Sequence, residues 1–228
     1  MSTLLDNIEV ETAPQPGAAI IWMHGLGADG NDFVPLVREL DLTGLGGIRF
    51  VFPHAGVMPV TINGGYEMRA WYDIVATDLT RREDERGLRA SQRQIEALIA
   101  REKARGIPAA RIVLAGFSQG CAMALQAGVR HPEPLAGLLC LSGYLPLADK
   151  TAAERDAASL ATPIFLAHGS ADPVVPMARA TESRAALQAL GYRSSGTTTR
   201  CSIRCARKRS TTSEPGCAAC SLRSITLS

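Results

Sequence analysis

The sequence lacks several features that would place it in other classes of protein. No apolar run approaches the length of about 18 residues that a membrane-spanning helix needs, so stable membrane insertion is not expected. The first 17 residues lack the basic start and long apolar stretch of a secretory signal. Basic and aromatic residues do not interleave as a nucleic-acid surface requires. We therefore expect a cytoplasmic protein that binds no nucleic acid.

Histidine is scarce and absent from the last part of the chain. The 228 residues include four histidines, and none follows His168. Any chemistry that needs an imidazole must therefore use His24, His54, His131 or His168.

The composition changes sharply near residue 193. Residues 194–228 contain six basic residues and one acidic residue, whereas acidic residues outnumber basic ones before that point. Four of the six cysteines also fall in this short segment. It has neither helical nor strand periodicity and is rich in Ser, Thr and Arg, so we expect 194–228 to be a disordered tail.

Buried strands and amphipathic helices alternate in the first 193 residues. Each apolar run is continuous rather than alternating, as in a parallel sheet covered on both faces. Helical patterns lie between the runs, and in the segment 87–105 the residues Leu88, Ile95, Leu98 and Ile99 form one stripe. The pattern predicts a single α/β domain with a mainly parallel sheet flanked by helices. The predicted strands are 18–23, 49–52, 111–115, 138–142 and 163–167; the other predicted helices are 121–130 and 178–190.

The pentapeptide GFSQG, residues 116–120, matches the G-x-S-x-G pattern that exposes a serine on a turn between a strand and a helix. A predicted strand precedes it and a predicted helix follows it, as the pattern requires. Glycines suit this turn because a Cβ would clash where backbone segments come close together. Ser118 is therefore the candidate nucleophile, and a chance match is the alternative.

Two further loops follow predicted strands and complete the candidate site. HGLGADG, residues 24–30, suits one half of an oxyanion hole, and the spacing of its glycines fits neither a dinucleotide nor a phosphate loop. The candidate oxyanion donors are the backbone N–H groups of Leu26 and Gln119. Asp172 follows the fifth predicted strand, where the acid of a Ser–Asp–His order is expected.

These motifs, with TINGGYEMRAWYDI and LSGYLP, resemble the bacterial carboxylesterases and acyl-protein thioesterases, the phospholipase/carboxylesterase family of α/β hydrolases. The resemblance extends from about Ala18 to Arg193. It implies an α/β-hydrolase fold, Ser118 as nucleophile, Asp172 as acid, and the N–H groups of Leu26 and Gln119 as oxyanion donors. It also implies hydrolysis of small-molecule acyl esters of short to medium length, or of acyl thioesters, without a cofactor. Cys121 stands where the family usually has glycine and is expected to narrow the pocket.

The catalytic histidine of this family is missing from the sequence. The resemblance implies a base about thirty residues after the acid, in a segment like Y-P-M-x-H, near Ile203. The genetic code permits codons for 194–220 that, read one base earlier, spell VEWHDYPMQHSVCAEEIDDIGAWLRRL. In this alternative-frame sequence the histidine codon overlaps that of Ile203, and an amphipathic helix follows. We therefore expect a frameshift near Arg193, a hydrolase domain over 1–193 that lacks its last strand and helix, and a crippled active site.

Two other interpretations are open. A non-catalytic relic or acyl-ligand binder on the same scaffold would also lack the base. The four tail cysteines could bind zinc, but their spacing fits no known finger pattern, so no metal site is expected. Those cysteines are Cys201, Cys205, Cys217 and Cys220.

Overall fold

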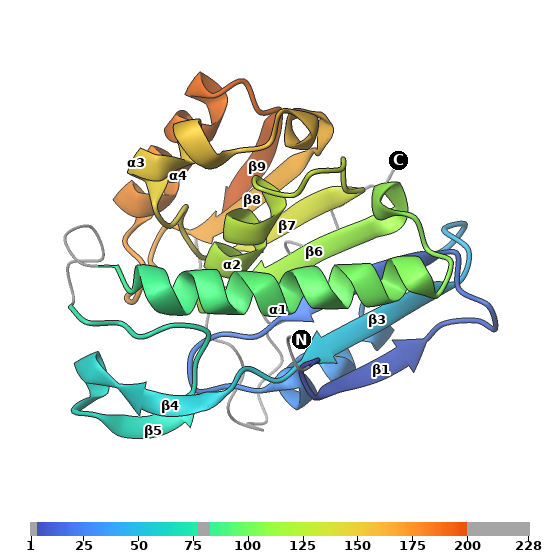
Figure 1. Ribbon diagram of the computed structural model, residues 1–228, viewed down its shortest axis with the longest axis horizontal. Helices are drawn as coiled ribbons and strands as arrows, with labels where there is room; N and C mark the ends of the chain where they lie inside the picture. Colours follow the sequence, from blue (N-terminus) through green and yellow to red (C-terminus); the bar gives the residue numbers. More distant parts are fainter. Residues whose placement is uncertain (1–3, 77–82, 200–228) are drawn as a thin grey trace.

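The computed structural model describes residues 4–76 and 83–199, which form a seven-stranded sheet with helices packed on it (Figure 1). The strand order is β1-β3-β2-β6-β7-β8-β9, and every neighbouring pair is parallel except β1 with β3. The expected fold class, a mainly parallel sheet flanked by helices, is confirmed. The strands are β1 (Asn7–Glu11), β2 (Ala18–Met23), β3 (Ile48–Pro53), β6 (Ile112–Phe117), β7 (Gly137–Leu141), β8 (Ile164–Gly169) and β9 (Ser194–Thr199).

All five strands predicted from continuous apolar runs are present, each within two residues of its predicted ends. They are the five inner strands β3, β2, β6, β7 and β8, each of which pairs with a strand on both of its sides. The prediction missed β1 at one edge. It also missed a separate antiparallel hairpin formed by β4 (Val57–Val60) and β5 (Tyr66–Arg69). These strands are partly exposed. β1 and β5 have no continuous apolar run, and the short apolar run of β4, VMPV, contains a proline.

Four α-helices lie on the same face of the sheet (Figure 1). The longest, α1, is capped at its amino end by Asp84, whose carboxylate accepts a hydrogen bond from the Gly87 N–H at 2.9 Å. Its predicted stripe from Leu88 to Ile99 is buried against the sheet. The helices are α1 (Glu85–Ala104), α2 (Gln119–Gly128), α3 (Ala148–Glu154) and α4 (Met177–Ala189).

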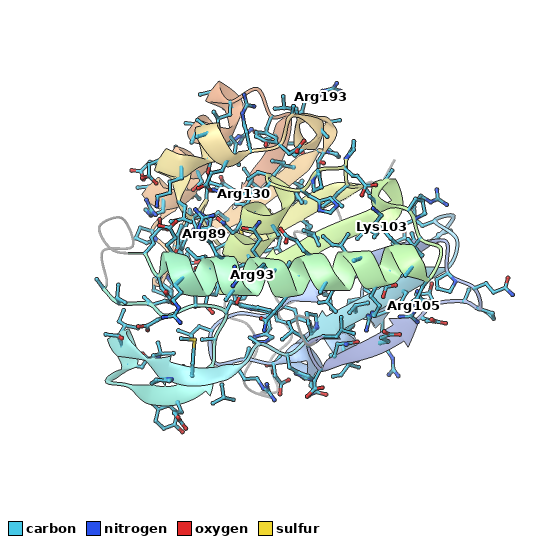
Figure 2. The ribbon with its side chains drawn as sticks, viewed as in Figure 1. Arg89, Arg93, Lys103, Arg105, Arg130 and Arg193 are labelled. Atoms are coloured by element: carbon cyan, nitrogen blue, oxygen red, sulfur yellow. The ribbon has the colours of Figure 1, made fainter. Side chains whose placement is uncertain are left out.

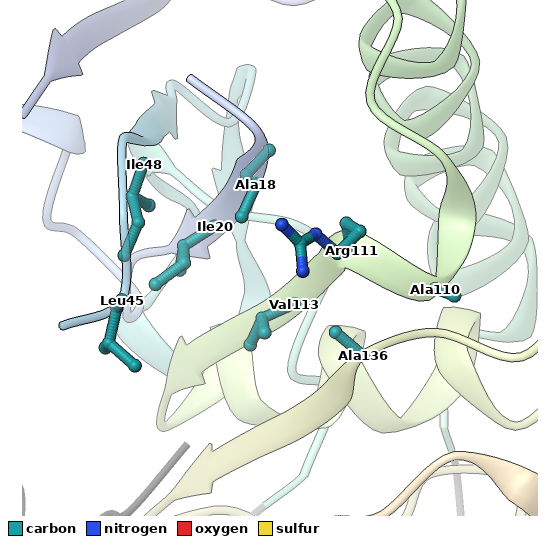
Figure 3. A pocket seen from close by; sticks show the side chains of 9 residues that line it. Ala18, Ile20, Leu45, Ile48, Ala110, Arg111, Val113 and Ala136 are labelled. Atoms are coloured by element: carbon teal, nitrogen blue, oxygen red, sulfur yellow. The ribbon is translucent and has the colours of Figure 1, made fainter. Parts of the chain in front are cut away.

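The opposite face is covered less completely by the described residues. Two 3-10 helices, η1 (Gly30–Asp32) and η2 (Val34–Arg38), cover β2 and β3, and Phe33 packs on Trp22 with ring centroids 5.6 Å apart. No α-helix between residues 4 and 199, with 77–82 left aside, covers this face. A hollow of about 230 Å³ opens there at the amino ends of the strands (Figure 3). It is lined by Ala18, Ala19, Ile20, Leu45, Ile48, Ala110, Arg111, Val113 and Ala136.

The predicted loss of the last strand is wrong for the first six residues of the tail. Residues Ser194–Thr199 form β9, which pairs in parallel with β8 from Ile164 opposite Ser194 to Gly169 opposite Thr199. Parallel pairing depends on backbone hydrogen bonds, and three consecutive threonines favour an extended chain. The prediction missed β9 because it relied on apolar periodicity, which an exposed edge strand does not need. The rest of the predicted tail, 200–228, and its four cysteines lie outside the described residues.

Several cations on the helical side of the molecule form ion pairs with neighbouring carboxylates, among them Arg89, Lys103, Arg105 and Arg130, which are labelled in Figure 2. Arg89 and Arg130 share Glu154, with N–O distances of 2.5 and 2.9 Å, and Lys103 pairs with Glu133.

Among the described residues, no helix is long and apolar enough to cross a membrane.

Candidate active site

Ser118 lies on a strained turn between β6 and α2, as the GFSQG motif predicts. Its backbone has φ 54° and ψ −116°, a region that a residue with a side chain rarely adopts. The flanking glycines allow this turn. A Cβ on Gly120 would meet the backbone of Met23 and His24 at less than 3.0 Å, and one on Gly116 would meet the first turn of α2. Strain held in place by close packing is typical of a functional position.

The turn that contains Leu26 lies directly beside Ser118. A Cβ built on Gly25 would lie 3.5 Å from the Ser118 Cβ. The Gly25 carbonyl accepts hydrogen bonds from His24 Nδ1 at 2.8 Å and from the Ala28 N–H at 3.2 Å. Because the peptide bond is trans, the Leu26 N–H points away from these two donors. The orientation of the Leu26 N–H is therefore fixed.

The Gln119 N–H is fixed in the same way. The Ser118 carbonyl, on the same peptide unit, accepts a hydrogen bond from the Ala122 N–H at 3.2 Å inside α2. The Gln119 N–H consequently points out of the amino end of α2, where helical N–H groups have no partner within the helix and the helix dipole favours negative charge. A negatively charged oxygen bound to this end of the helix would be stabilised.

Asp172 lies in the loop after β8, and its side chain is 5% exposed. Its Oδ1 atom accepts hydrogen bonds from the Val174 N–H at 2.8 Å and the Val175 N–H at 3.1 Å. Its Oδ2 atom is 3.9 Å from His168 Nε2, which instead bonds to the Val175 carbonyl at 2.8 Å. The loop therefore holds the carboxylate in one orientation through a single oxygen.

Ser118 and Asp172 are located at the same edge of the sheet. Ser118 follows β6 and Asp172 follows β8, with β7 between them, so two strand spacings of about 4.8 Å separate the two strand ends. The Ser118 N–H donates to the Leu141 carbonyl at 2.8 Å, and the Ser142 N–H donates to the Ala167 carbonyl at 2.8 Å. These bonds align the carboxyl ends of the three strands.

The four histidines occupy structural positions. His24 is fully buried, its Nε2 accepts the Ala55 N–H at 3.0 Å, and burial lowers its pKa. His54 Nδ1 accepts the Gly30 N–H at 3.2 Å. His131 lies just beyond the carboxyl end of α2, a helix length of about 15 Å from Ser118, and burial lowers its pKa. Within residues 4–76 and 83–199, no hydrogen bond joins a histidine to Ser118.

Cys121 is 1% exposed and belongs to the core between α2 and the sheet. A Cβ on Gly143 would meet its Sγ atom at 2.5 Å, so this thiol fills the space behind the Ser118 turn. The expectation that its side chain narrows a pocket is therefore wrong.

The sequence interpretation did not single out Trp71 or the side chain of Gln119, although the segment containing Trp71 contributed to the resemblance. Gln119 is 3% exposed; its Oε1 atom accepts the Trp71 N–H at 2.9 Å and its Nε2 atom donates to the Tyr72 carbonyl at 2.7 Å. The glutamine in the GFSQG motif gives no indication that its side chain bonds to Trp71, 48 residues away in the sequence.

Comparison with known proteins identifies the family. A model of the phospholipase/carboxylesterase family matches residues 6–204. The chain belongs to this family. It is 38% identical to acyl-protein thioesterase 1 of Schizosaccharomyces pombe over 176 residues, which cover 77% of this chain and 78% of the relative.

Two more relatives support the same assignment. Acyl-protein thioesterase 1 of Neurospora crassa is 43% identical over 183 residues, covering 77% of this chain and 75% of the relative. The crystal structure of Zea mays acyl-protein thioesterase 2 superposes with a TM-score of 0.72 at 28% identity, covering 84% of this chain and 90% of that structure. The chain is therefore a hydrolase of the carboxylesterase and acyl-protein thioesterase type by descent.

Proposed function

We propose that the scaffold hydrolyses short to medium acyl esters and acyl thioesters through an acyl-enzyme on Ser118. The observation that carries this proposal is the strained Ser118 turn beside the turn that contains Leu26, with the Leu26 and Gln119 N–H groups each held in one orientation. The names of the thioesterase relatives support an acyl substrate.

The proposed reaction has two steps. Ser118 Oγ attacks the acyl carbonyl while a base takes its proton, and the carbonyl oxygen becomes an oxyanion that the Leu26 and Gln119 N–H groups stabilise. The alcohol or thiol leaves with that proton, and the acyl group stays on Ser118. Water then attacks the acyl-enzyme by the same route and releases the carboxylic acid. Asp172 would orient the base and stabilise its charged form.

We propose that this chain is crippled because it lacks the base. An unassisted serine hydroxyl is a weak nucleophile at neutral pH. None of the four histidines is available for the role, because each lies at a structural position. A frameshift after Arg193 accounts for the loss, since the alternative-frame sequence has its histidine at the position of Ile203.

The incompletely covered sheet face supports the same frameshift. Parallel sheets are normally covered on both faces. Here Leu139 and Phe165 on that face are only half-buried, and the hollow beside β2 and β6 is open. The amphipathic helix in the alternative-frame sequence is an element of the right kind to cover such a face.

The missing base also favours a second candidate, a non-catalytic relic that binds acyl ligands. A fluorophosphonate that labels activated serines separates the two functions. The main test compares turnover of p-nitrophenyl butyrate by this chain and by a chain in which 194–220 is replaced with the alternative-frame sequence. Ser118→Ala in each chain gives the background rate. Restored turnover that depends on Ser118 supports the esterase; an inactive replacement favours the relic.

A further inference from the structure

Trp71 connects the two backbone segments that flank Ser118. Its indole Nε1–H donates to the His24 carbonyl at 2.9 Å, and its backbone N–H donates to Gln119 Oε1 at 2.9 Å. Its ring is 2% exposed and packs against the His24 imidazole with centroids 5.2 Å apart. Ser91 Oγ donates to the Trp71 carbonyl, so the backbone N–H and the backbone carbonyl of Trp71 both form hydrogen bonds.

These bonds reach both candidate oxyanion donors. His24 precedes Gly25, and its Nδ1 holds the carbonyl of the peptide unit that carries the Leu26 N–H. On the other side, Trp71 and Tyr72 hold the Gln119 side chain from both its oxygen and its nitrogen. One residue therefore ties the turn after β2 to the first residue of α2.

We propose that Trp71 is a positioning residue that sets the separation of the Leu26 and Gln119 N–H groups. This inference rests on the proposed function of those two groups. Oxyanion stabilisation depends on donors held within about half an ångström of their productive positions. Hydrogen bonds in a buried network are stronger than in water, so this network is suited to hold them.

The chain contains a matched control for this proposal. It has two tryptophans, and the other, Trp22, is 1% exposed. Among the described residues, its Nε1 has no hydrogen-bond partner. Trp71→Phe and Trp22→Phe therefore remove the same atoms from buried sites, but only Trp71→Phe removes a hydrogen bond to the Ser118 neighbourhood.

The first measurement is independent of activity and uses the full chain. NMR order parameters of the Leu26 and Gln119 N–H vectors should be near 0.85, as in a rigid backbone, and should fall below about 0.7 in Trp71→Phe. Trp22→Phe should leave them unchanged. Equal order parameters in both variants would overturn the proposal. If Trp71→Phe does not fold, Ser91→Ala takes its place, because it removes the bond to the Trp71 carbonyl and keeps the ring; unchanged order parameters would then overturn it.

The second measurement uses the chain with the alternative-frame sequence restored. Trp71→Phe should lower kcat for p-nitrophenyl butyrate about tenfold and change KM less than about twofold, since loss of a whole oxyanion donor lowers kcat 10²- to 10³-fold. Trp22→Phe should keep kcat within about twofold. Equal losses of kcat in the two variants would contradict the positioning role. If the restored chain is inactive, the proposed function fails, and the order parameters alone decide whether Trp71 fixes the donors.

Discussion

Thr199 lies opposite Gly169 in the parallel register of β9 and β8. The chain therefore reaches the carboxyl edge of the sheet beside the loop that carries Asp172. Ile203 is four residues further along the sequence, so a histidine near that position needs only a short connection to reach Asp172 and Ser118. This register bears on how esterase activity could be restored.

Ile203→His alone should not restore esterase activity, whereas replacing 194–220 with the alternative-frame sequence should. A catalytic imidazole needs packed neighbours to hold it, and a single substitution supplies none of them. Turnover of p-nitrophenyl butyrate and the temperature of thermal unfolding should both rise, and only in the full replacement. Equal turnover of the two proteins would contradict this prediction. The replacement puts Trp at position 196, where a Cβ would meet the Leu166 backbone, so β9 must also shift.

Asp172→Asn in the restored chain should lower kcat by about four orders of magnitude. Such losses follow removal of the acid in other serine hydrolases. Asn keeps an oxygen that can accept the hydrogen bond from the Val174 N–H. The loop should therefore keep its conformation, and the temperature of thermal unfolding should change little. Steady-state kinetics and circular dichroism check the two expectations. A drop in the unfolding temperature that accounts for the lost activity would argue for a structural role instead.

Gly120→Ala should destabilise the fold by about 3 kcal/mol or more, the upper end of the usual cost of overpacking, because its Cβ would meet backbone rather than a flexible side chain. Gly56→Ala is the control, since a Cβ there meets open space. Urea unfolding of both variants measures the difference. Similar midpoints would mean that the close approach of α2 to β2 is not tight.

Glu102→Gln should cost about 3 to 5 kcal/mol of unfolding free energy. Glu102 is fully buried and pairs with Arg49 at 2.7 Å, Arg101 at 2.9 Å and Arg105 at 3.1 Å. The substitution removes the negative charge of Glu102, so the positive charge of the buried Arg49 guanidinium is less completely balanced. Glu133→Gln, at an exposed ion pair with Lys103, should change the unfolding free energy much less, because solvent screens exposed charges. Denaturant unfolding of the two variants tests this ranking.

Stability should fall as the pH is lowered below about 6.5, in part because of His131. Burial lowers the pKa of this histidine in the folded state, while the unfolded chain keeps the ordinary value near 6.5. The unfolded state therefore binds the proton first, and stability is lost as the pH falls from 6.5 towards the folded pKa. His131→Leu should flatten the dependence of unfolding free energy on pH between 5 and 7. An unchanged slope would assign the effect to other groups, His24 among them.

The inner strands and the Ser118 turn were predictable because local sequence determines them. Continuous apolar runs mark strands buried on both faces, and GFSQG needs only its own glycines and the adjoining strand and helix. The edge strands β1 and β9 were missed because backbone pairing, rather than side-chain pattern, holds them. The contacts of Trp71 were not predictable, since they join residues 47 and 48 positions apart along the chain.

The strand order has a consequence for how the chain is synthesised. From β6 onward, each new strand is added to the outer edge formed by the one before it, through β7 and β8 to β9. Everything made before Arg193 can therefore pair and pack while the ribosome is still translating the remainder. The proposed change of reading frame at that point would alter β9, at the outer edge of the sheet, and the residues after it, and would leave the inner strands unchanged. All the residues that form the Ser118 turn and the Asp172 loop would be translated before such a change, so both would fold even in a chain whose end is altered.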